Sequence, residues 1–553
     1  MTSISREPAE ATRRTIWQSL DHSARLFGER DAVVYQNTHV TYAELRHQVN
    51  KLAAGLLSAG IKPGDHVAIV FPLTPEWIYV HYALASMGAI VAPVNYNYKG
   101  DEIRWVLERG DVAAVIAADA YLNLNFLELL KSADLALERG EVHSERFPAI
   151  KRMFVLDSTE KGGPYSLRTL LDHEPSQSEM ARLEEIRAGQ TADDPCYVLF
   201  TSGSTARPKS AFLPHRAVCG VGYYMARSCA MDENDRFLSM LTTFHIGGVV
   251  PCIHMPHSVG AASVLVGGFD PAVVLETIER ERCTVSGGFD TMFTKIMGHP
   301  AFKTTDVSSL RRAFCACTPS YYDRLQAVFN FDLLAMTYGT TEGSSSVCLV
   351  MPEDTDPEAR RNSNGRPHPG VEIRIVDPET GNSVPPGTPG EICFRGWDRF
   401  LKYYKMPEET AASIDAEGFV HMGDYGWLDE QGYLYYRGRY KMMVKTGGEN
   451  VSQREVEIFL EDNIPSVEFA QVVGVPDEVW NEAVVAFVQL RARIGATPEE
   501  IREQCRGKIA GFKIPKHVFI LEASEWPLLA VGRPDKHTLR RMAMERLGRA
   551  DLV

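Results

Sequence analysis

The sequence contains no apolar run long enough to cross a membrane, since nowhere do about 18 apolar residues follow one another. Its first residues lead to Arg13 and Arg14 without the apolar segment of a secretory signal. No unit of roughly 20 to 50 residues is repeated, and no low-complexity tract is present. We therefore expect a cytoplasmic protein that is neither exported nor built from repeats and has no transmembrane segment; a peripheral membrane contact stays open.

Cysteines are few and scattered. The 10 of them include no Cys-x-x-Cys pair, and the nearest two, Cys315 and Cys317, have no zinc-like spacing with histidine. They are expected to be reduced thiols in the core. His245, His254 and His257 lie near one another, but a proline separates the last two and no acidic ligand is nearby, so we expect no metal site there.

Positive charge is also in short supply. The 58 lysines and arginines are outnumbered by 72 acidic residues, and the formal net charge of -14 has the wrong sign for binding a nucleic acid. The apolar fraction of 44% excludes wholesale disorder. A chain of 553 residues is too long for one hydrophobic core, so two or more domains with a cleft between them are expected, whereas the oligomeric state stays open.

Short apolar runs alternate with helical patterns along most of the chain. Residues 67–71, 113–117 and 152–156 are typical of buried strands, and residues 42–59 have the period of a helix. This alternation predicts an α/β fold in which a large N-terminal domain, residues 1–438, contains parallel sheets flanked by helices.

The pattern changes in the last third of the chain. Strand-like alternation broken by turns, from residue 371 to 396, predicts a small β subdomain at about 365–438. Beyond it, Ser452-Gln453-Arg454-Glu455 has the spacing of a helix capping box. Mixed helix and strand patterns over residues 439–553 predict a small α+β C-terminal domain that folds as its own unit.

A candidate phosphate-binding loop follows an apolar strand at 197–200. It gathers hydroxyl groups, one glycine and one lysine: Thr201, Ser202, Gly203, Ser204, Thr205 and Lys209. Backbone N–H groups of such a turn can point at one anion, hydroxyls add donors, and lysine supplies a charge for terminal phosphates. The Walker pattern is absent, because Lys209 follows a proline and only one glycine is present. The loop indicates a different kind of phosphate site, with a solvated loop as the alternative.

The loop resembles that of the adenylate-forming (AMP-binding) superfamily, Thr-Ser-Gly-Ser/Thr-Thr-Gly-x-Pro-Lys-Gly, whose members include acyl-CoA synthetases, peptide-synthetase adenylation domains and luciferases. Two further blocks follow in the family's order: Tyr338-Gly339-Thr340-Thr341-Glu342, and His421-Met422-Gly423-Asp424 with Gly438-Arg439-Tyr440-Lys441. The resemblance runs from Thr41 to about Arg540. It implies an enzyme with a large AMP-binding domain and a small mobile C-terminal domain.

The resemblance implies that ATP and Mg²⁺ are used. Glu342 would bind the metal, which prefers carboxylate and phosphate oxygens. Tyr338 would face the adenine, and Thr341 would donate to the α-phosphate. Asp424 would accept hydrogen bonds from both ribose hydroxyls, with Arg439 supporting the nucleotide. Taken singly, Glu342 could be a helix-start charge and Asp424 a turn residue. The other implied cofactor contacts are those of Gly339, Thr340, Lys445, Gly447, Gly448 and Asn450.

In this family the C-terminal domain rotates after adenylate formation, and the implied pivot here is Lys441. Gly447 and Gly448 would then approach the pantetheine arm of the acceptor, while Asn450 would face the active site. Five basic residues could meet the phosphates of CoA, or could simply form solvated helix faces: Arg502, Arg506, Lys508, Lys513 and Lys516.

The chain departs from the family pattern at the acid side. The family's late lysine is replaced by Arg533, whose planar fork is no simple substitute, and Lys536 could compensate only if the loop shifts. Asp290 stands where proline is common, and could answer a polar or cationic substrate group or be exposed. His245 would stand between the acid pocket and the thiol tunnel, with a buried structural histidine as the alternative. The expected acid pocket comprises His245, Gly288, Asp290, Ala316, Cys317 and Thr318.

The leading hypothesis is an acyl-CoA synthetase that converts a small acid to acyl-AMP and then to a CoA thioester. Its expected catalytic residues are His245, Glu342, Lys441 and Arg533. The first alternative keeps the adenylation but uses a carrier-protein thiol or an amine as acceptor, including nitrite-activating diazotase-type chemistry. The second alternative, suggested by Arg533 and the altered pocket, is a nucleotide-binding relative that has lost turnover.

Overall fold

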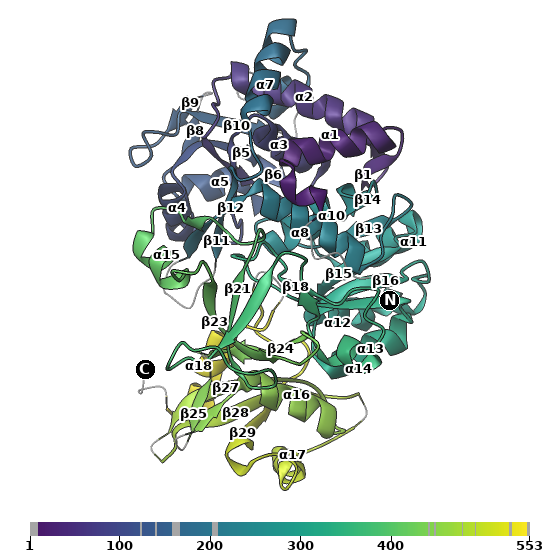
Figure 1. The fold of residues 1–553 in the computed structure, drawn as a ribbon, viewed down its shortest axis with the longest axis vertical. Coiled ribbons are helices and arrows are strands. Elements are labelled where there is room, and N and C mark those ends of the chain that lie inside the picture. The colour runs from purple at the N-terminus through teal and green to yellow at the C-terminus, as the bar shows by residue number, and fades with distance from the viewer. Residues whose placement is uncertain are drawn as a thin grey trace.

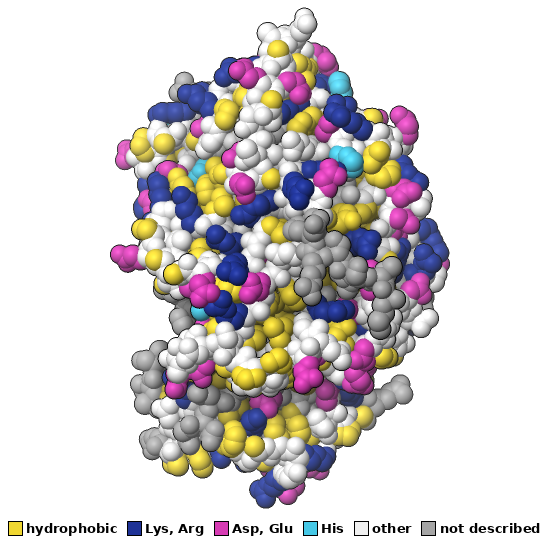
Figure 2. All heavy atoms as spheres, in the orientation of Figure 1, with side chains coloured by type: hydrophobic (Ala, Val, Ile, Leu, Met, Phe, Trp, Pro, Cys, Tyr) yellow, Lys and Arg dark blue, Asp and Glu magenta, His cyan; other side chains and the backbone are white. Residues whose placement is uncertain are grey.

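The computed structural model describes residues 9–121, 124–138, 141–156, 166–201, 208–440, 443–446, 449–477, 479–492, 494–529 and 533–549. Two large sheets with their helices form the upper part of the molecule in Figure 1, a four-stranded sheet lies below them, and the C-terminal domain is at the bottom. Figure 2 shows a notch in the surface where the large part meets the C-terminal domain.

The first large sheet has seven strands in the order β10-β5-β3-β4-β11-β12-β22. The five strands from β10 to β11 are parallel, and β12 and β22 are antiparallel additions. Three of the apolar runs expected to be strands are β3, β5 and β10. The strands are β3 (His66–Val70), β4 (Ile90–Pro93), β5 (Val112–Ala118), β10 (Arg152–Leu156), β11 (Pro195–Thr201), β12 (Lys209–Pro214) and β22 (Lys402–Tyr403).

The second large sheet has nine strands in the order β19-β18-β17-β16-β15-β13-β14-β1-β2. Its centre, from β17 to β1, is parallel, which confirms the α/β prediction. The strands are β1 (Asp31–Tyr35), β2 (Thr38–Thr41), β13 (Arg236–Ser239), β14 (Ala262–Leu265), β15 (Val285–Phe289), β16 (Arg312–Ala316), β17 (Leu333–Tyr338), β18 (Cys348–Leu349) and β19 (Arg366–Pro367).

Helices cover both sheets and fill the space between them. Helix α3 contacts β4 of the first sheet and β1 of the second, which explains why it is apolar on nearly all sides. The helices of this part are α1 (Ile16–Phe27), α2 (Tyr42–Ser58), α3 (Pro75–Ser86), α4 (Gly100–Arg109), α5 (Phe126–Lys131), α6 (Leu167–Leu171), α7 (Gln177–Gly189), α8 (His215–Ser228), α9 (Ile246–Val249), α10 (Met255–His257), α11 (Pro271–Glu281), α12 (Asp290–Gly298), α13 (Pro319–Phe329), α14 (Pro357–Asn362) and α15 (Pro407–Ser413).

A small antiparallel sheet lies between the large sheets and the C-terminal domain, in the region where the β subdomain was expected. Its order is β20-β21-β23-β24. The register of β23 and β24 shifts after Tyr425, which marks a bulge close to Asp424. The strands are β20 (Glu372–Val376), β21 (Gly390–Arg395), β23 (Val420–Leu428) and β24 (Leu434–Arg439).

The C-terminal domain has one five-stranded sheet with an apolar core on each face. Val456 and Leu460 of α16 pack on one face, and Leu539 and Ala543 of α18 pack on the other. The elements are β25 (Val444–Thr446), β26 (Glu449–Val451), α16 (Gln453–Asn463), β27 (Val467–Asp477), β28 (Asn481–Leu490), α17 (Pro498–Cys505), β29 (His517–Ile520) and α18 (Lys536–Arg546).

The predicted capping box at the start of α16 is only half formed. The Ser452 side chain accepts a hydrogen bond from the Glu455 backbone, as an N-cap should, and its hydroxyl donates to the Arg437 carbonyl oxygen. The Glu455 carboxylate does not return to Ser452, because it binds Lys513 instead.

All 10 cysteines are buried and free, in agreement with the core thiols expected. Within the described ranges no helix is long and apolar enough to span a bilayer.

Candidate active site

A buried carboxylate, Asp424, lies at the junction of the second large sheet and the small antiparallel sheet. Tyr338 ends β17, and its hydroxyl donates to Asp424 Oδ2 at 2.8 Å. Arg439 is the cross-strand partner of Asp424, with its Nε 3.3 Å from Oδ1. Oδ1 is buried, yet no described residue donates a hydrogen bond to it. Oδ1 therefore has the Arg439 ion pair and keeps acceptor capacity for a ligand.

Burial and the neighbouring polar groups shift the pKa of Asp424 in opposite directions. Burial raises the pKa of the carboxyl to about 6, while Arg439 and the Tyr338 hydroxyl oppose the shift. The group is therefore ionised at neutral pH and becomes protonated in mildly acidic solution.

The turn after Tyr338 is so tight that glycine is required in it. A Cβ at Gly339 would lie 1.8 Å from the Ser345 carbonyl oxygen. The Thr340 hydroxyl accepts from the Gly343 backbone, and Ser345 has a positive φ of 96°, which is strained for a residue with a side chain. The turn presents Thr341 and Glu342 next to the Tyr338 backbone.

Glu342 is 4% exposed and accepts a hydrogen bond from the Tyr403 hydroxyl. On the other side of that ring, Lys209 Nζ lies 4.7 Å from the ring centroid. Tyr403 therefore contacts both the Glu342 carboxylate and Lys209, which follows the candidate phosphate-binding loop. Thr201 and Lys209 are register partners at the loop end of the β11 and β12 hairpin. The loop residues Ser202, Gly203, Ser204 and Thr205 lie outside the described residues.

The expected acid-pocket residues lie where β15 and β16 end side by side. Gly288 pairs with Cys315, and Phe289 pairs with Ala316. The carboxyl ends of parallel strands are where ligands bind in sheets of this kind. A Cβ on Gly288 would lie 3.2 Å from Met240 Cε and 3.5 Å from Met292 Sδ, both flexible side chains.

Two more pocket residues follow β16. The Cys317 thiol lies 3.7 Å from Met336 Sδ, and Thr318 accepts from the Tyr321 backbone as the N-cap of α13. Sequence reasoning missed Met240, Met292 and Met336, which lie beside the expected pocket residues Gly288 and Cys317, because no motif marks them.

His245 caps α9 at the edge of this pocket and is half buried. Burial lowers its pKa to about 4, and the charge of Arg533 adds to the shift. The imidazole is therefore neutral at physiological pH. Its ring lies 4.8 Å from that of Phe244, which in turn meets the edge of Tyr96.

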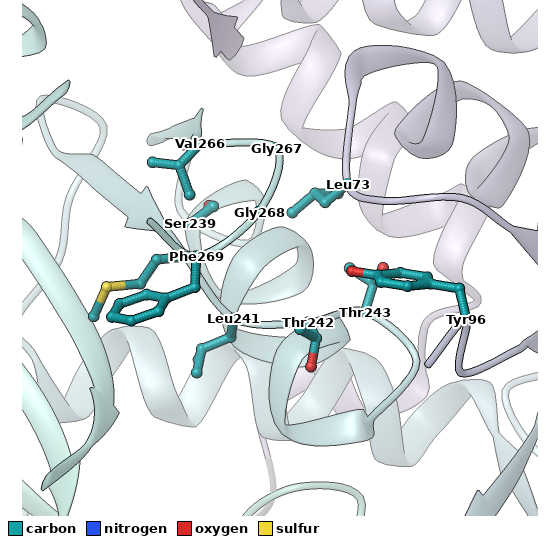
Figure 3. A pocket seen from close by; sticks show the side chains of 11 residues that line it. Leu73, Tyr96, Ser239, Leu241, Thr242, Thr243, Val266, Gly267, Gly268 and Phe269 are labelled. Carbon is teal, nitrogen blue, oxygen red and sulfur yellow. The ribbon is translucent and has the colours of Figure 1, made fainter. Parts of the chain in front are cut away.

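A small pocket adjoins His245 on the side of the first sheet. It is lined by Leu73 and Tyr96 from the loops after β3 and β4, and by residues 239–243 and 266–269 after β13 and β14. Figure 3 shows Leu73 and Tyr96 facing the loop that carries Thr242 and Thr243. Met240 lines this pocket and also lies beside Gly288.

The two departures at the acid side lie close together across the domain boundary. The Arg533 guanidinium lies over the Phe289 ring at 4.1 Å, next to Asp290. Burial raises the pKa of the Asp290 carboxyl, and Arg454 and Arg533 oppose the shift. Lys536 bonds to Gln453 and Glu457 within the C-terminal domain, so it does not take the place of the missing lysine.

Two family models cover most of the chain. Residues 20–404 match the model described as AMP-binding enzyme, and residues 456–533 match the model described as AMP-binding enzyme C-terminal domain. The chain belongs to the AMP-binding family of adenylate-forming enzymes. It is a ligase.

Relatives of the ligase span nearly its full length. YngI of Bacillus subtilis (strain 168), named provisionally as an acyl-CoA synthetase, is 34% identical over 97% of this chain and 98% of its own. The human mitochondrial medium-chain acyl-CoA ligase ACSF2 is 32% identical over 96% of this chain and 88% of its own. The anthranilate CoA ligase AuaEII, solved with anthranoyl-AMP, shares the fold with a TM-score of 0.83 at 23% identity, over 98% of this chain and 100% of its own.

The candidate hinge and pantetheine residues of the ligase are only partly described. Lys441, Gly447 and Gly448 lie outside the described residues, as does the side chain of Asn450. Lys445 pairs with Asn450 in the hairpin of β25 and β26, and its backbone donates to Glu482. No described contact joins Lys445 to the residues around Asp424.

The five basic residues proposed for CoA have different surroundings. Arg502 donates to the Pro515 carbonyl oxygen, Arg506 pairs with Glu503, and Lys513 pairs with Glu455. Lys516 instead lies over the exposed Trp480 ring at 4.2 Å. No side-chain contact of Lys508 decides between the two interpretations.

The clustered histidines lie in two different places. His245 is at the acid pocket, whereas His254 and His257 are in a buried network between the two large sheets. Tyr82 bonds to His257 Nδ1 at 2.9 Å, and the Tyr197 hydroxyl approaches His254 Nε2 at 3.5 Å. Burial lowers the pKa of His254 to about 3 and that of His257 to about 4, so both are neutral core residues.

One described group of residues does have the convergence of metal ligands. His421 Nδ1 lies 3.1 Å from Glu391 Oε2 and 3.3 Å from Cys393 Sγ. Glu391 also accepts from the Gly423 backbone, and Asp415 faces the other nitrogen of His421. These contacts hold the strand segment that ends in Asp424, so they have a structural role next to the nucleotide side.

Proposed function

We propose that the ligase activates a carboxylic acid with ATP as an acyl adenylate and then transfers the acyl group to the thiol of CoA. The observation that carries this proposal is the unsatisfied, buried Oδ1 of Asp424. Ribose hydroxyls are donors that such an atom would accept, while Tyr338 and Arg439 hold the carboxylate in place. The names of YngI and ACSF2 support CoA as the acceptor.

In the first step a carboxylate oxygen of the acid attacks the α-phosphorus, and the bond to pyrophosphate breaks. Two anions must meet, so the protein's main task is to neutralise charge and align the partners. Lys209 and Arg439 supply positive charge on the nucleotide side, and Arg533 supplies it from the C-terminal domain. Thr340 and Thr341 lie in the tight turn from which they can donate to the phosphates.

Glu342 fits a magnesium site. Its carboxylate is buried, and among the described residues the Tyr403 hydroxyl donates a hydrogen bond to one of its two oxygens. Mg²⁺ commonly binds one or two carboxylates and completes its shell with phosphates and water. When bound, the ion would neutralise charge on the phosphate oxygens.

In the second step the thiol sulfur attacks the acyl carbon, the thiol proton is lost, and AMP leaves. His245 is neutral at physiological pH and lies at the mouth of the pocket, so it would not hold a thiolate by charge. We propose that the C-terminal domain turns about Lys441 to bring Gly447, Gly448 and Asn450 to the pantetheine arm. Lys516 beside Trp480 offers a cation and an aromatic face for the nucleotide of CoA.

The pocket favours an apolar acid. Gly288 lies against the flexible side chains of Met240 and Met292, and methionine side chains adapt their shape to different ligands. The name of ACSF2 points in the same direction, and we propose a medium-chain aliphatic acid as the substrate class.

ATP–pyrophosphate exchange over a panel of straight-chain and aromatic acids tests the first step, and the product masses with and without CoA test the second. Exchange with medium-chain acids and a CoA-dependent thioester is expected. Exchange without a thioester, followed by product with an amine or a carrier protein, would favour the other acceptors. Absence of exchange with every acid and with nitrite would favour a nucleotide-binding protein without turnover.

A further inference from the structure

The first turn of α12 is tied to the surface on which the C-terminal domain rests. The Tyr321 hydroxyl donates to the Asp290 carbonyl oxygen at 2.6 Å, so α12 begins against α13. Helix α13 in turn contacts the C-terminal domain at two places. Ser320 donates a hydrogen bond to Asp462 of α16, and Arg324 forms an ion pair with Glu468 at the start of β27. Asp290 therefore lies at the edge of this interface.

Two arginines of the C-terminal domain reach that edge. Arg454 projects from the first turn of α16 and lies 3.6 Å from Glu457 of the same helix. Arg533 reaches across to the large domain, with its guanidinium over Phe289. Glu457 also accepts hydrogen bonds from Lys536 and from the Val472 backbone. Glu457 and Glu461 are the acids whose charges most raise the pKa of Arg454, and Asp290 follows them.

Asp290 is the acidic group whose charge acts on Arg533. The Arg533 side chain is exposed, yet enough protein surrounds its guanidinium for desolvation to lower its pKa. Asp290 opposes that shift, and Arg454 and Arg439 add to it. Like charges that converge before ATP arrives repel one another. A carboxylate at position 290 reduces that repulsion. Because the arginines already supply positive charge near Asp290, its carboxylate does not require a cationic substrate to balance it.

We propose that Asp290 is a positioning residue that holds the Arg533 loop of the C-terminal domain over the acid pocket during acyl-adenylate formation. This inference rests on the proposed function. It links two departures from the family pattern: arginine replaces the late lysine, and an acid replaces proline at the place that the arginine reaches. Asp290 acts through Arg533 and touches neither ATP nor the acid substrate.

A double-mutant cycle tests the link. Asp290→Asn keeps the size and removes the charge, Arg533→Lys restores the family residue, and the two are combined. We expect Asp290→Asn to lower kcat of ATP–pyrophosphate exchange about tenfold with little change in KM for the acid. Thioester formation from synthetic acyl-AMP and CoA should change less than about twofold, because the loop has then left the pocket. Asp290→Glu should restore part of the exchange activity.

Non-additivity is the decisive outcome. The cost of Asp290→Asn should largely vanish when Arg533 is already lysine. Asp323→Asn is the matched control, because Asp323 is on neighbouring α13 but pairs with Arg361 inside the large domain. Strictly additive effects, or equal losses in both half-reactions, would overturn the proposal. A changed preference among acids, with gain or loss of amine-bearing substrates, would favour a direct contact of Asp290 with the substrate.

A measurement without turnover separates this proposal from the proposed function. Spin labels on Val328→Cys in α13 and Ile494→Cys in the C-terminal domain report the distance between the domains, and the native cysteines are buried and should not be labelled. With ATP alone, Asp290→Asn should broaden the distance distribution or shift it away from that of the unmutated chain. An unchanged distribution would count against the positioning role even if every acid failed in the exchange assay.

Discussion

The nucleotide side and the acid side of the cleft are built in different ways. On the nucleotide side, Tyr338, Asp424 and Arg439 make direct contacts inside one domain, and Tyr403 joins Glu342 to Lys209. On the acid side, Arg533 comes from another domain and meets Asp290 through charge rather than through a direct ion pair. One side is therefore preorganised, whereas the other is assembled by the position of a second domain.

The largest effect is expected on the preorganised side. Glu342→Ala should lower ATP–pyrophosphate exchange by about 100- to 1,000-fold, because the carboxylate proposed for Mg²⁺ is lost. Tyr403→Phe, which keeps Glu342 and removes its hydrogen bond, is the matched control and should cost far less. Exchange rates at several magnesium concentrations check this, and equal losses in the two variants would place the function in Tyr403.

The assembled side should be sensitive to the hinge. Lys441→Pro should leave exchange nearly unchanged and lower thioester formation from acyl-AMP by about 100-fold, because a misplaced second domain cannot align the thiol. The two half-reactions measured separately provide the check. If both fell together, the assignment of the hinge to Lys441 would be wrong.

A change of charge at Asp424 should have a smaller effect. Asp424→Asn keeps one acceptor oxygen and should raise KM for ATP about tenfold. Because burial raises the pKa of Asp424 to about 6, kcat/KM for ATP should fall as the pH drops through 6 in the unmutated enzyme. The profile of Asp424→Asn should be flatter in that range. An identical profile in both proteins would assign the pH dependence to another group.

The smallest effect concerns the packing that supports both sides. His254 and His257 have folded-state pKa values below the ordinary value of histidine. Their contribution to folding stability is therefore complete above about pH 6.5 and is lost as the pH falls. At about pH 5.5 each should cost roughly 1.4 kcal/mol of stability. Thermal unfolding from pH 8 to pH 5 measures this. His254→Phe should reduce the pH dependence, and an unchanged slope would show that His254 does not titrate on unfolding.

The sequence predicted the parallel α/β architecture because strands and helices leave periodic patterns, as at β3, β5, β10 and α2. It also marked Tyr338, Asp424 and Arg439, because these residues lie in short ordered motifs. It did not mark Tyr403 or the pocket methionines. Their roles depend on long-range packing that no local spacing records.

Position 290 shows the same division. The amino-acid sequence determined that an aspartate and an arginine depart from the pattern at 290 and 533, and it left open a substrate contact or an exposed site. Only the tertiary structure decided that Arg533 reaches Phe289 and the neighbouring Asp290, 243 positions earlier in the chain, when α16 docks on α13. Short sequence motifs show which functional groups are neighbours along the chain. The charge balance of a cleft depends instead on which surfaces pack together in the folded protein.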